Sequence, residues 1–144
     1  MEIKSKLYPY LFFDGNAEEA IRYYAEALEL GEPEIMFFDE ETAEDMNASP
    51  GSVLHASLDF ANTSLYFSDD PMNHPRPAEA SMYSLTFATE DGELFERAWE
   101  KFTREGTVVM AAGETFYAKK YGMVKDRFGI LWHFMLDFPS ENQI

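Results

Sequence analysis

Hydrophobic and polar positions alternate along the chain with two different periods, which predict a strand followed by a helix at the start. LYPYLFF (7–13) is short, aromatic and β-prone, and it predicts a strand. Asn16 and Glu19 resemble a capping box at the start of a helix. The helix is predicted over 17–29 by apolar residues at helical spacing, namely Ala17, Ala20, Ile21, Tyr24 and Leu28. Gly31 and Pro33 end it.

The first half continues with three more segments. EIMFFD (34–39) predicts a strand, whereas 40–51 is polar, acidic and ends in a Pro-Gly turn, so we expect a mobile loop there. VLHASLDF (53–60) alternates, placing His55, Ser57 and Asp59 on the face opposite its apolar residues. With TSLYFSD (63–69) it predicts a hairpin. The proline-rich segment 70–81, which contains His74, is interpreted as a linker.

The second half repeats this order. A strand is predicted over 82–88, and a helix follows, with one apolar stripe ended by Gly106; the stripe is Leu94, Phe95, Ala98, Trp99 and Phe102. A strand over 107–112, a loop over 112–122 and a last hairpin around 127–129 complete the chain. An offset of 74 residues superimposes the first strands and helices, and an offset of 66 places Phe67 on His133.

The repeated order β-α-β-β-β predicts an α+β fold of two equivalent βαβββ modules in which one helix covers one face of each sheet. We expect one domain over 1–144, with module one at about 1–70, the linker at about 70–81 and module two at about 82–138. The uncovered faces must be buried against something else or form a cavity.

Composition restricts the function classes. The chain has 144 residues, 46% of them hydrophobic, and no cysteine, which excludes disulfides, cysteine nucleophiles and thiolate metal sites. A formal charge of −16 argues against nucleic acid and anionic membranes as partners. Because the chain has no run of 18 apolar residues and no signal-peptide core, we expect a cytoplasmic protein. No serine lies in a G-x-S-x-G elbow and no Ser-His-Asp order is visible, so the sequence does not favour a nucleophilic triad.

Two stretches carry a family resemblance. PYLFFDGNAEEAIRYYAEAL near the start and FYAKKYGMVKDRFGILWHF near the end resemble the signature stretches of the PhnB-like branch of the vicinal oxygen chelate (glyoxalase/bleomycin-resistance/dioxygenase) superfamily. The resemblance implies a curved mixed sheet built from the two modules, with a concave cleft, and a homodimer. Some members of that branch carry a ubiquinone-methyltransferase label, but the sequence has no glycine-rich methyl-donor loop.

Enzymes of this superfamily hold a divalent metal with His, Glu or Gln side chains from strands 1, 4, 5 and 8. Aligned on the resemblance, these four slots fall at Pro9 (or Tyr10), Phe67, Tyr83 or Ser84, and His133. Only His133 is a good ligand. We therefore expect no metal and no other cofactor.

The resemblance places His133 in the cleft, where a core histidine and a ligand contact are the competing interpretations. His55 either lines the same cleft or lies exposed at the sheet rim. The predicted ligand-binding set is completed by Phe13, Phe67 and Phe116, as an apolar surface with stacking capacity, and by Tyr117 and Lys119 of the loop before the last hairpin.

Three functions follow from these residues and from the resemblance. The first is a metal-free protein that holds a small apolar or aromatic molecule in the cleft. The second is a metal-dependent or general acid–base enzyme of the lyase, isomerase or dioxygenase type, using His55 and His133. The third is a structural or interaction dimer without a ligand.

Overall fold

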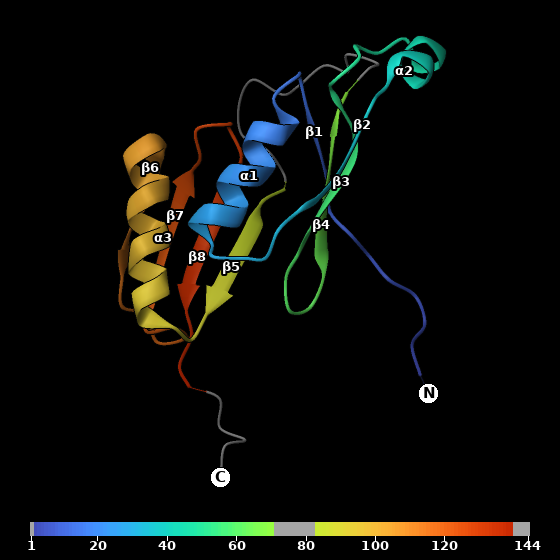
Figure 1. Ribbon diagram of the computed structural model, residues 1–144. Helices are drawn as coiled ribbons and strands as arrows, with labels where there is room; N and C mark the ends of the chain where they lie inside the picture. Colours follow the sequence, from blue (N-terminus) through green and yellow to red (C-terminus); the bar gives the residue numbers. More distant parts are fainter. Residues whose placement is uncertain (1, 71–82, 140–144) are drawn as a thin grey trace. The chain divides into compact units, whose positions relative to one another are not determined.

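Two four-stranded mixed sheets, each with a helix on one face, form the framework of the protein (Figure 1). The computed structural model describes residues 2–70 and 83–139. The chain divides into two compact units, Met1–Arg76 and Pro77–Ile144, which are described separately below as unit 1 and unit 2. The α+β class and the two βαβββ-like modules predicted from the sequence are confirmed.

Unit 1 contains the sheet of order β1-β4-β3-β2, in which β1 and β4 are parallel and the other pairs are antiparallel. Its elements are β1 (Tyr10–Phe13), α1 (Ala17–Ala27), β2 (Glu34–Phe37), α2 (Glu40–Met46), β3 (Val53–Asp59) and β4 (Ser64–Asp69). Unit 2 has the same topology, with the order β5-β8-β7-β6. Its elements are β5 (Leu85–Thr89), α3 (Gly92–Glu105), β6 (Thr107–Gly113), β7 (Lys120–Lys125) and β8 (Leu131–Leu136).

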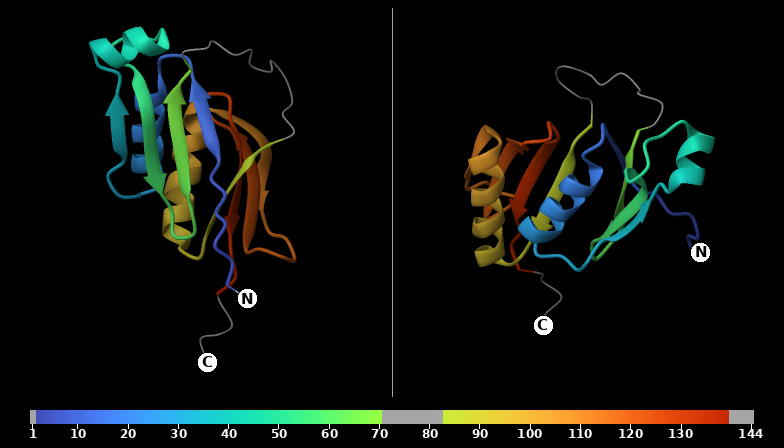
Figure 2. Two further views of the ribbon diagram at one scale, coloured as in Figure 1. Left: turned by 90° about the vertical axis from the view of Figure 1, so that its right-hand side faces the viewer. Right: turned by 45° about the horizontal axis from the view of Figure 1, so that its top comes forward.

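In unit 1 the core lies between α1 and its sheet, which Figure 2 shows from two further sides. Ile21 and Tyr24 of α1 are fully buried, and the Tyr24 ring lies 5.9 Å from that of Phe67 on β4. Phe13 stacks on Phe67 from the neighbouring strand, with ring centroids 5.9 Å apart. Each fully buried aromatic side chain of this kind contributes about 2 kcal/mol of hydrophobic stabilisation.

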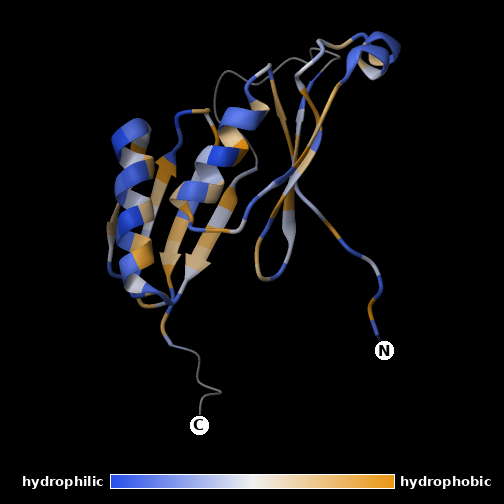
Figure 3. Cartoon of the chain, in the orientation of Figure 1, coloured by the Kyte–Doolittle hydropathy of each residue, from blue (hydrophilic) through white to orange (hydrophobic). Residues whose placement is uncertain are grey.

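The core of unit 2 is a second aromatic layer. Phe102 of α3 packs edge-on against Trp132 and Phe134 of β8, with ring centroids 5.4 and 5.0 Å away. In Figure 3 the outward side of α3 is coloured as hydrophilic, whereas the strands of unit 2 are largely hydrophobic. This agrees with an apolar stripe on the side of α3 that faces the sheet. No helix in the described ranges 2–70 and 83–139 has the length and apolar character needed to cross a membrane.

The predicted capping box at the start of α1 is wrong. The Asn16 side chain makes no capping hydrogen bond. The backbone N–H of Ala17 donates instead to the buried carboxylate of Asp69 at the end of β4, at 2.9 Å, and the N–H of Val53 donates to the other oxygen at 2.8 Å. A negative charge at a helix N-terminus is favourable, so Asp69 ties α1 to β3 and β4 in a way that local sequence does not show.

The loop expected over 40–51 is also wrong, since it contains the helix α2. Asp39 and Thr42 form a reciprocal capping box, Ala43 is buried, and Asn47 ends the helix in the left-handed conformation. The segment is acidic, and only one of the seven helical residues is buried. It therefore has no apolar stripe from which the helix could be predicted.

The predicted linker and His74 lie almost entirely outside the described residues, which resume at Tyr83. The joining of the two modules into one curved sheet with a concave cleft stays a prediction.

Candidate functional site

The face of the unit 1 sheet that α1 does not cover presents a group of aromatic side chains. Successive residues on a strand point to opposite faces, so burial of Leu65 and Phe67 under α1 turns Tyr66 to the open face. Tyr66 pairs in register with Tyr10 of β1, and Met36 of β2 pairs with His55 of β3. Residues from all four strands therefore meet on this face.

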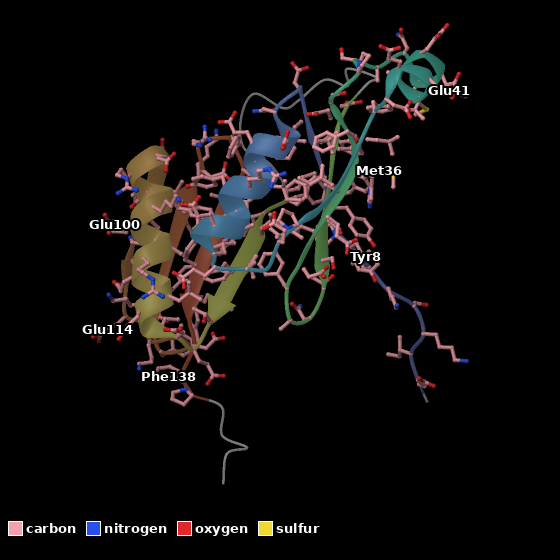
Figure 4. The ribbon with its side chains drawn as sticks, in the orientation of Figure 1. Tyr8, Met36, Glu41, Glu100, Glu114 and Phe138 are labelled. Carbon is pink, nitrogen blue, oxygen red and sulfur yellow. The ribbon has the colours of Figure 1, made fainter. Side chains whose placement is uncertain are left out.

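Five rings on the open face of unit 1 contact one another, namely Tyr8, Tyr10, Phe12, His55 and Tyr66. Met36 pairs in register with His55 on the same face, and we call these six residues the aromatic face. Tyr8 stacks on Tyr66 with ring centroids 4.7 Å apart, and Tyr10 stacks on Phe12 at 4.9 Å. Tyr66 meets Tyr10 edge-on at 5.7 Å, which joins the two stacks. Figure 4 shows Tyr8 and Met36 projecting from the side of this sheet away from α1.

His55 is held by the tyrosines around it. Its Nδ1 and the Tyr10 hydroxyl share a hydrogen bond of 2.8 Å, and its ring lies edge-on to Tyr66 at 4.8 Å. Desolvation raises the pKa of Tyr10, with a smaller contribution from Tyr66 in the same direction and an opposing one from Ser68. The pKa of Tyr66 is also raised, first by desolvation and then by Tyr8. Both phenols are therefore neutral hydrogen-bonding groups at neutral pH.

Unit 2 places a second histidine on the open face of its sheet. His133 alternates with the buried Trp132 and Phe134, as the sequence predicts, and points away from α3. Its Nδ1 and the Tyr121 hydroxyl are 2.5 Å apart, and its Nε2 lies 2.9 Å from Ser84 Oγ. Burial raises the pKa of Tyr121, and the neighbouring Tyr117 adds to the effect.

The predicted position of Phe13 and Phe67 on the open face is wrong. Both are buried on the face that packs under α1, and Phe67 has no exposed surface. The offset of 66 that placed Phe67 on His133 is one residue short for these strands. In unit 1 the N–H of Asp70, directly after β4, donates to Phe13 O, and in unit 2 the N–H of Asp137, directly after β8, donates to Thr89 O. Asp70 and Asp137 are therefore equivalent, and β4 and β8 are related by an offset of 67. His133 then corresponds to Tyr66.

The corrected register reveals an exchange between the two units. Ser57 pairs with Tyr66, and Met123 pairs with His133, so the β3 and β7 strands are related by 66 residues and His55 corresponds to Tyr121. Unit 1 has the histidine on β3 and the tyrosine on β4, whereas unit 2 has the tyrosine on β7 and the histidine on β8. Each unit keeps one diagonal histidine–tyrosine ring contact on its open face, at 4.8 Å in unit 1 and 5.8 Å in unit 2.

The other predicted residues lie between β6 and β7 in unit 2. Phe116 is 94% exposed and meets Tyr117 edge-on at 5.0 Å. Tyr117 in turn lies 5.8 Å from Tyr121, which connects the segment to His133. Lys119 is exposed, and its backbone N–H donates to Leu136 O.

Sequence reasoning missed most of the aromatic face and two partners of His133. Tyr10 and Phe12 alternate with Leu11 and Phe13, and this alternation was the available signal for their face. Ser84 and Tyr121 could not be paired with His133 from the sequence, because their contact depends on the register of three strands.

The metal site of the superfamily enzymes is not matched by the residues present. Of the predicted slots, Pro9 and the buried Phe67 have no ligating atom, and Tyr10, Tyr83 and Ser84 offer only hydroxyl groups. Both ring nitrogens of His133 already have hydrogen-bond partners. Neutral phenols and hydroxyls are poor ligands for Zn²⁺ or Fe²⁺. Within residues 2–70 and 83–139, no three His, Asp or Glu side chains gather in a metal-binding arrangement.

The family model described as 3-demethylubiquinone-9 3-methyltransferase matches residues 5–135. The chain belongs to this family. Protein YjdN of Escherichia coli is 29% identical over 136 residues, which cover 88% of this chain and 91% of YjdN. The PhnB-like resemblance seen in the sequence is confirmed.

Solved structures agree with this assignment. Protein PA1353 from Pseudomonas aeruginosa is 29% identical with a TM-score of 0.75, covering 92% of this chain and 97% of that one. A PhnB protein from Bacillus cereus is 25% identical with a TM-score of 0.71, covering 91% and 98%. The fosfomycin resistance protein FosX from Mesorhizobium loti shares the fold at 11% identity, with a TM-score of 0.58 over 98% of both chains. The PhnB-like chain therefore has the glyoxalase-like fold of the vicinal oxygen chelate superfamily.

Proposed function

We propose that this PhnB-like protein binds a small apolar or aromatic molecule on the open faces of its sheets, without a metal ion. The observation that carries the proposal is the aromatic face of unit 1. Large aromatic and sulfur-containing side chains normally lie in the core, yet Phe12 is 48% exposed and Met36 is 59% exposed there. A contiguous exposed group of this kind is typical of a binding surface.

The chemistry of the aromatic face favours a flat ligand. Stacked and edge-on ring pairs already occur in it, and a further ring added to such a group gains about 1 kcal/mol beyond its buried area. Met36 adds a polarisable side chain that adapts to different shapes. A ligand ring lying on Phe12 or Tyr66 would bury surface that is otherwise exposed to water.

A few polar groups beside the rings would orient the ligand. The His55–Tyr10 pair in unit 1 and the His133–Tyr121 pair in unit 2 offer hydrogen-bonding atoms beside aromatic rings. Apolar surfaces with a small number of placed polar groups are the usual form of small-molecule sites. The charge of −16 favours neutral or cationic ligands over anions.

The proposal is tested by replacing Phe12 with serine and titrating the full chain with neutral planar compounds, using 2-naphthol as the reference probe. We expect binding to raise the melting temperature of the wild type and the Kd to rise about tenfold in Phe12→Ser, since one stacking contact is lost. Met46→Ser is the matched control, because Met46 is 53% exposed but lies on α2. Its Kd should equal that of the wild type.

Two results would contradict the proposal. Equal losses of affinity in Phe12→Ser and Met46→Ser would remove the aromatic face as the site. Stoichiometric Zn, Fe, Mn or Ni in the purified protein, with ligand binding abolished by a chelator, would contradict the metal-free interpretation.

We also propose a homodimer, and light scattering on the same samples should give twice the chain mass of 16.6 kDa.

A further inference from the structure

A serine, a histidine and a tyrosine form a continuous hydrogen-bonded chain on the open face of unit 2. Ser84 Oγ lies 2.9 Å from His133 Nε2, and His133 Nδ1 lies 2.5 Å from the Tyr121 hydroxyl. Ser84 is exposed, whereas His133 and Tyr121 are partly buried. Each ring nitrogen of the histidine is thus committed to a different hydroxyl, and the exposed hydroxyl is the one on Nε2.

Three neighbouring strands fix this chain. Ser84 comes directly before β5, whose Thr86 pairs in parallel register with His133 of β8. Tyr121 lies on β7, the strand on the other side of β8, and its ring stacks on that of His133 at an interplanar angle of 20°. The segments on the two sides of β8 therefore each supply one hydroxyl partner of the imidazole.

We propose that Ser84 is a nucleophile activated by His133, with Tyr121 as the positioning residue, and that the site transfers acyl groups from small neutral carboxylic esters to water. The arrangement contains three parts of a covalent catalytic site: a hydroxyl, a base within hydrogen-bonding distance, and a group that orients the base. Tyrosine stands where hydrolases with a Ser-His-Asp triad have a carboxylate, which is why the sequence shows no such triad.

The tautomer of His133 decides whether Ser84 is activated. In the active form the Nδ1–H donates to the Tyr121 oxygen, so that Nε2 is free to accept the Ser84 proton. The phenol of Tyr121 stays protonated at neutral pH, so it orients the imidazole as a neutral acceptor and adds no negative charge. We therefore expect slower catalysis than a carboxylate-assisted triad would give.

The reaction balances with water alone. Ser84 Oγ bonds to the ester carbonyl carbon while its proton passes to His133 Nε2, and cleavage of the ester C–O bond releases an alcohol that takes this proton. Water then attacks the acyl carbon and gives a proton to Nε2. Release of the carboxylic acid returns that proton to Ser84 Oγ.

The surroundings indicate the kind of ester. Met123 and Met135 share the open face with His133, and Tyr117 lies beside Tyr121. These side chains offer apolar and aromatic contacts, and the negative charge of the chain disfavours anionic substrates. An ester with a short apolar or aromatic acyl group fits this chemistry.

The test uses an alkyl fluorophosphonate on the full chain, followed by intact mass measurement and peptide mapping. The reagent forms an Oγ–P bond and releases fluoride and the serine proton. We expect one adduct per chain on Ser84, none in Ser84→Ala, and a labelling rate lowered about 100-fold in His133→Gln, the size of a lost general base. Ser64→Ala is the matched control, since the Ser64 hydroxyl donates to Asp59 and has no histidine; labelling should be unchanged.

Tyr121→Phe tests positioning separately from folding. Labelling should slow about tenfold, and ¹⁵N shifts of His133 should show loss of the Nδ1–H tautomer, which a purely structural role of Tyr121 would leave unchanged. The proposal is overturned if wild-type Ser84 is not modified, if it reacts no faster than Ser64, or if His133→Gln reacts at the wild-type rate. The comparison of Ser84 with Ser64 within the wild type holds even if a histidine variant fails to fold. Because 2-naphthol binding is tested in unit 1, either result can fail without the other.

Discussion

Two buried carboxylates hold backbone groups in place, Asp69 across distant parts of the sequence and Asp126 within its own turn. Asp69 accepts from the N–H groups of Ala17 and Val53, and Asp126 accepts from the N–H groups of Phe128 and Ile130 and from the indole of Trp132. A buried carboxylate is tolerated where several donors replace water around it. These two residues therefore hold one helix start and one hairpin turn in place.

Replacing Asp69 with asparagine should lower the free energy of unfolding by about 3 kcal/mol, because an amide nitrogen then faces a backbone N–H and a charged acceptor is lost. Urea denaturation followed by circular dichroism measures the change. Asp59→Asn is the control, since Asp59 is exposed and accepts only from Ser64 among the bonds described; its effect should stay within about 0.5 kcal/mol. Similar losses in both variants would contradict the capping role of Asp69.

At the scale of helices and strands, the junction between α3 and β6 leaves no room for a side chain at Gly106. A Cβ placed on Gly106 would lie 2.3 Å from Lys125 O and 2.8 Å from Phe102 O. Both obstacles are backbone atoms, which cannot move aside as a side chain can. Glycine is required here because the helix end and the neighbouring strand β7 approach closely, and not because of an unusual φ.

Gly106→Ala should therefore destabilise the protein by about 3 kcal/mol through overpacking. Thermal unfolding measures the shift. Gly31→Ala provides the comparison, because no atom lies within 4 Å of a Cβ built on Gly31. A melting temperature for Gly106→Ala that matches that of Gly31→Ala would show that the junction relaxes.

For the molecule as a whole, three tyrosines on the open faces make the free energy of unfolding depend on pH in the alkaline range. The pKa values of Tyr10, Tyr66 and Tyr121 are all raised above 10.0, chiefly by desolvation. Above pH 10 the unfolded chain loses these protons before the folded chain does, so it binds fewer protons and the free energy of unfolding falls as pH rises. Below pH 10 the contribution is fully present.

The corresponding measurement is the free energy of unfolding at several pH values from 9 upward, in urea. We expect a steeper fall for the wild type than for Tyr121→Phe, because the variant has one fewer phenol with a raised pKa. The two proteins differ only at residue 121, so the difference between the slopes isolates the tyrosine. Equal slopes would show that the pKa of Tyr121 is the same in the folded and unfolded states.

Much of the fold was predictable because its signals are local. Helical spacing gave α1 and α3, and alternation placed His133 opposite Trp132 and Phe134. The helix α2 was missed because its seven residues bury only Ala43, which leaves no apolar period to detect. Phe67 was placed on the wrong face because a shift of one residue between repeats exchanges the two faces of a strand.

Periodicity along the chain was enough to define two modules, their helices and the face that each strand residue prefers, since these depend on neighbours within a few positions. The hydrogen-bond partners that are far apart in the sequence did not follow from this periodicity. Asp69 beneath α1, Tyr10 beside His55 and Ser84 beside His133 are 52, 45 and 49 residues from their contacts. Strand register brings such pairs together, and register is set by packing of the complete sheet against its helix, which no short segment contains.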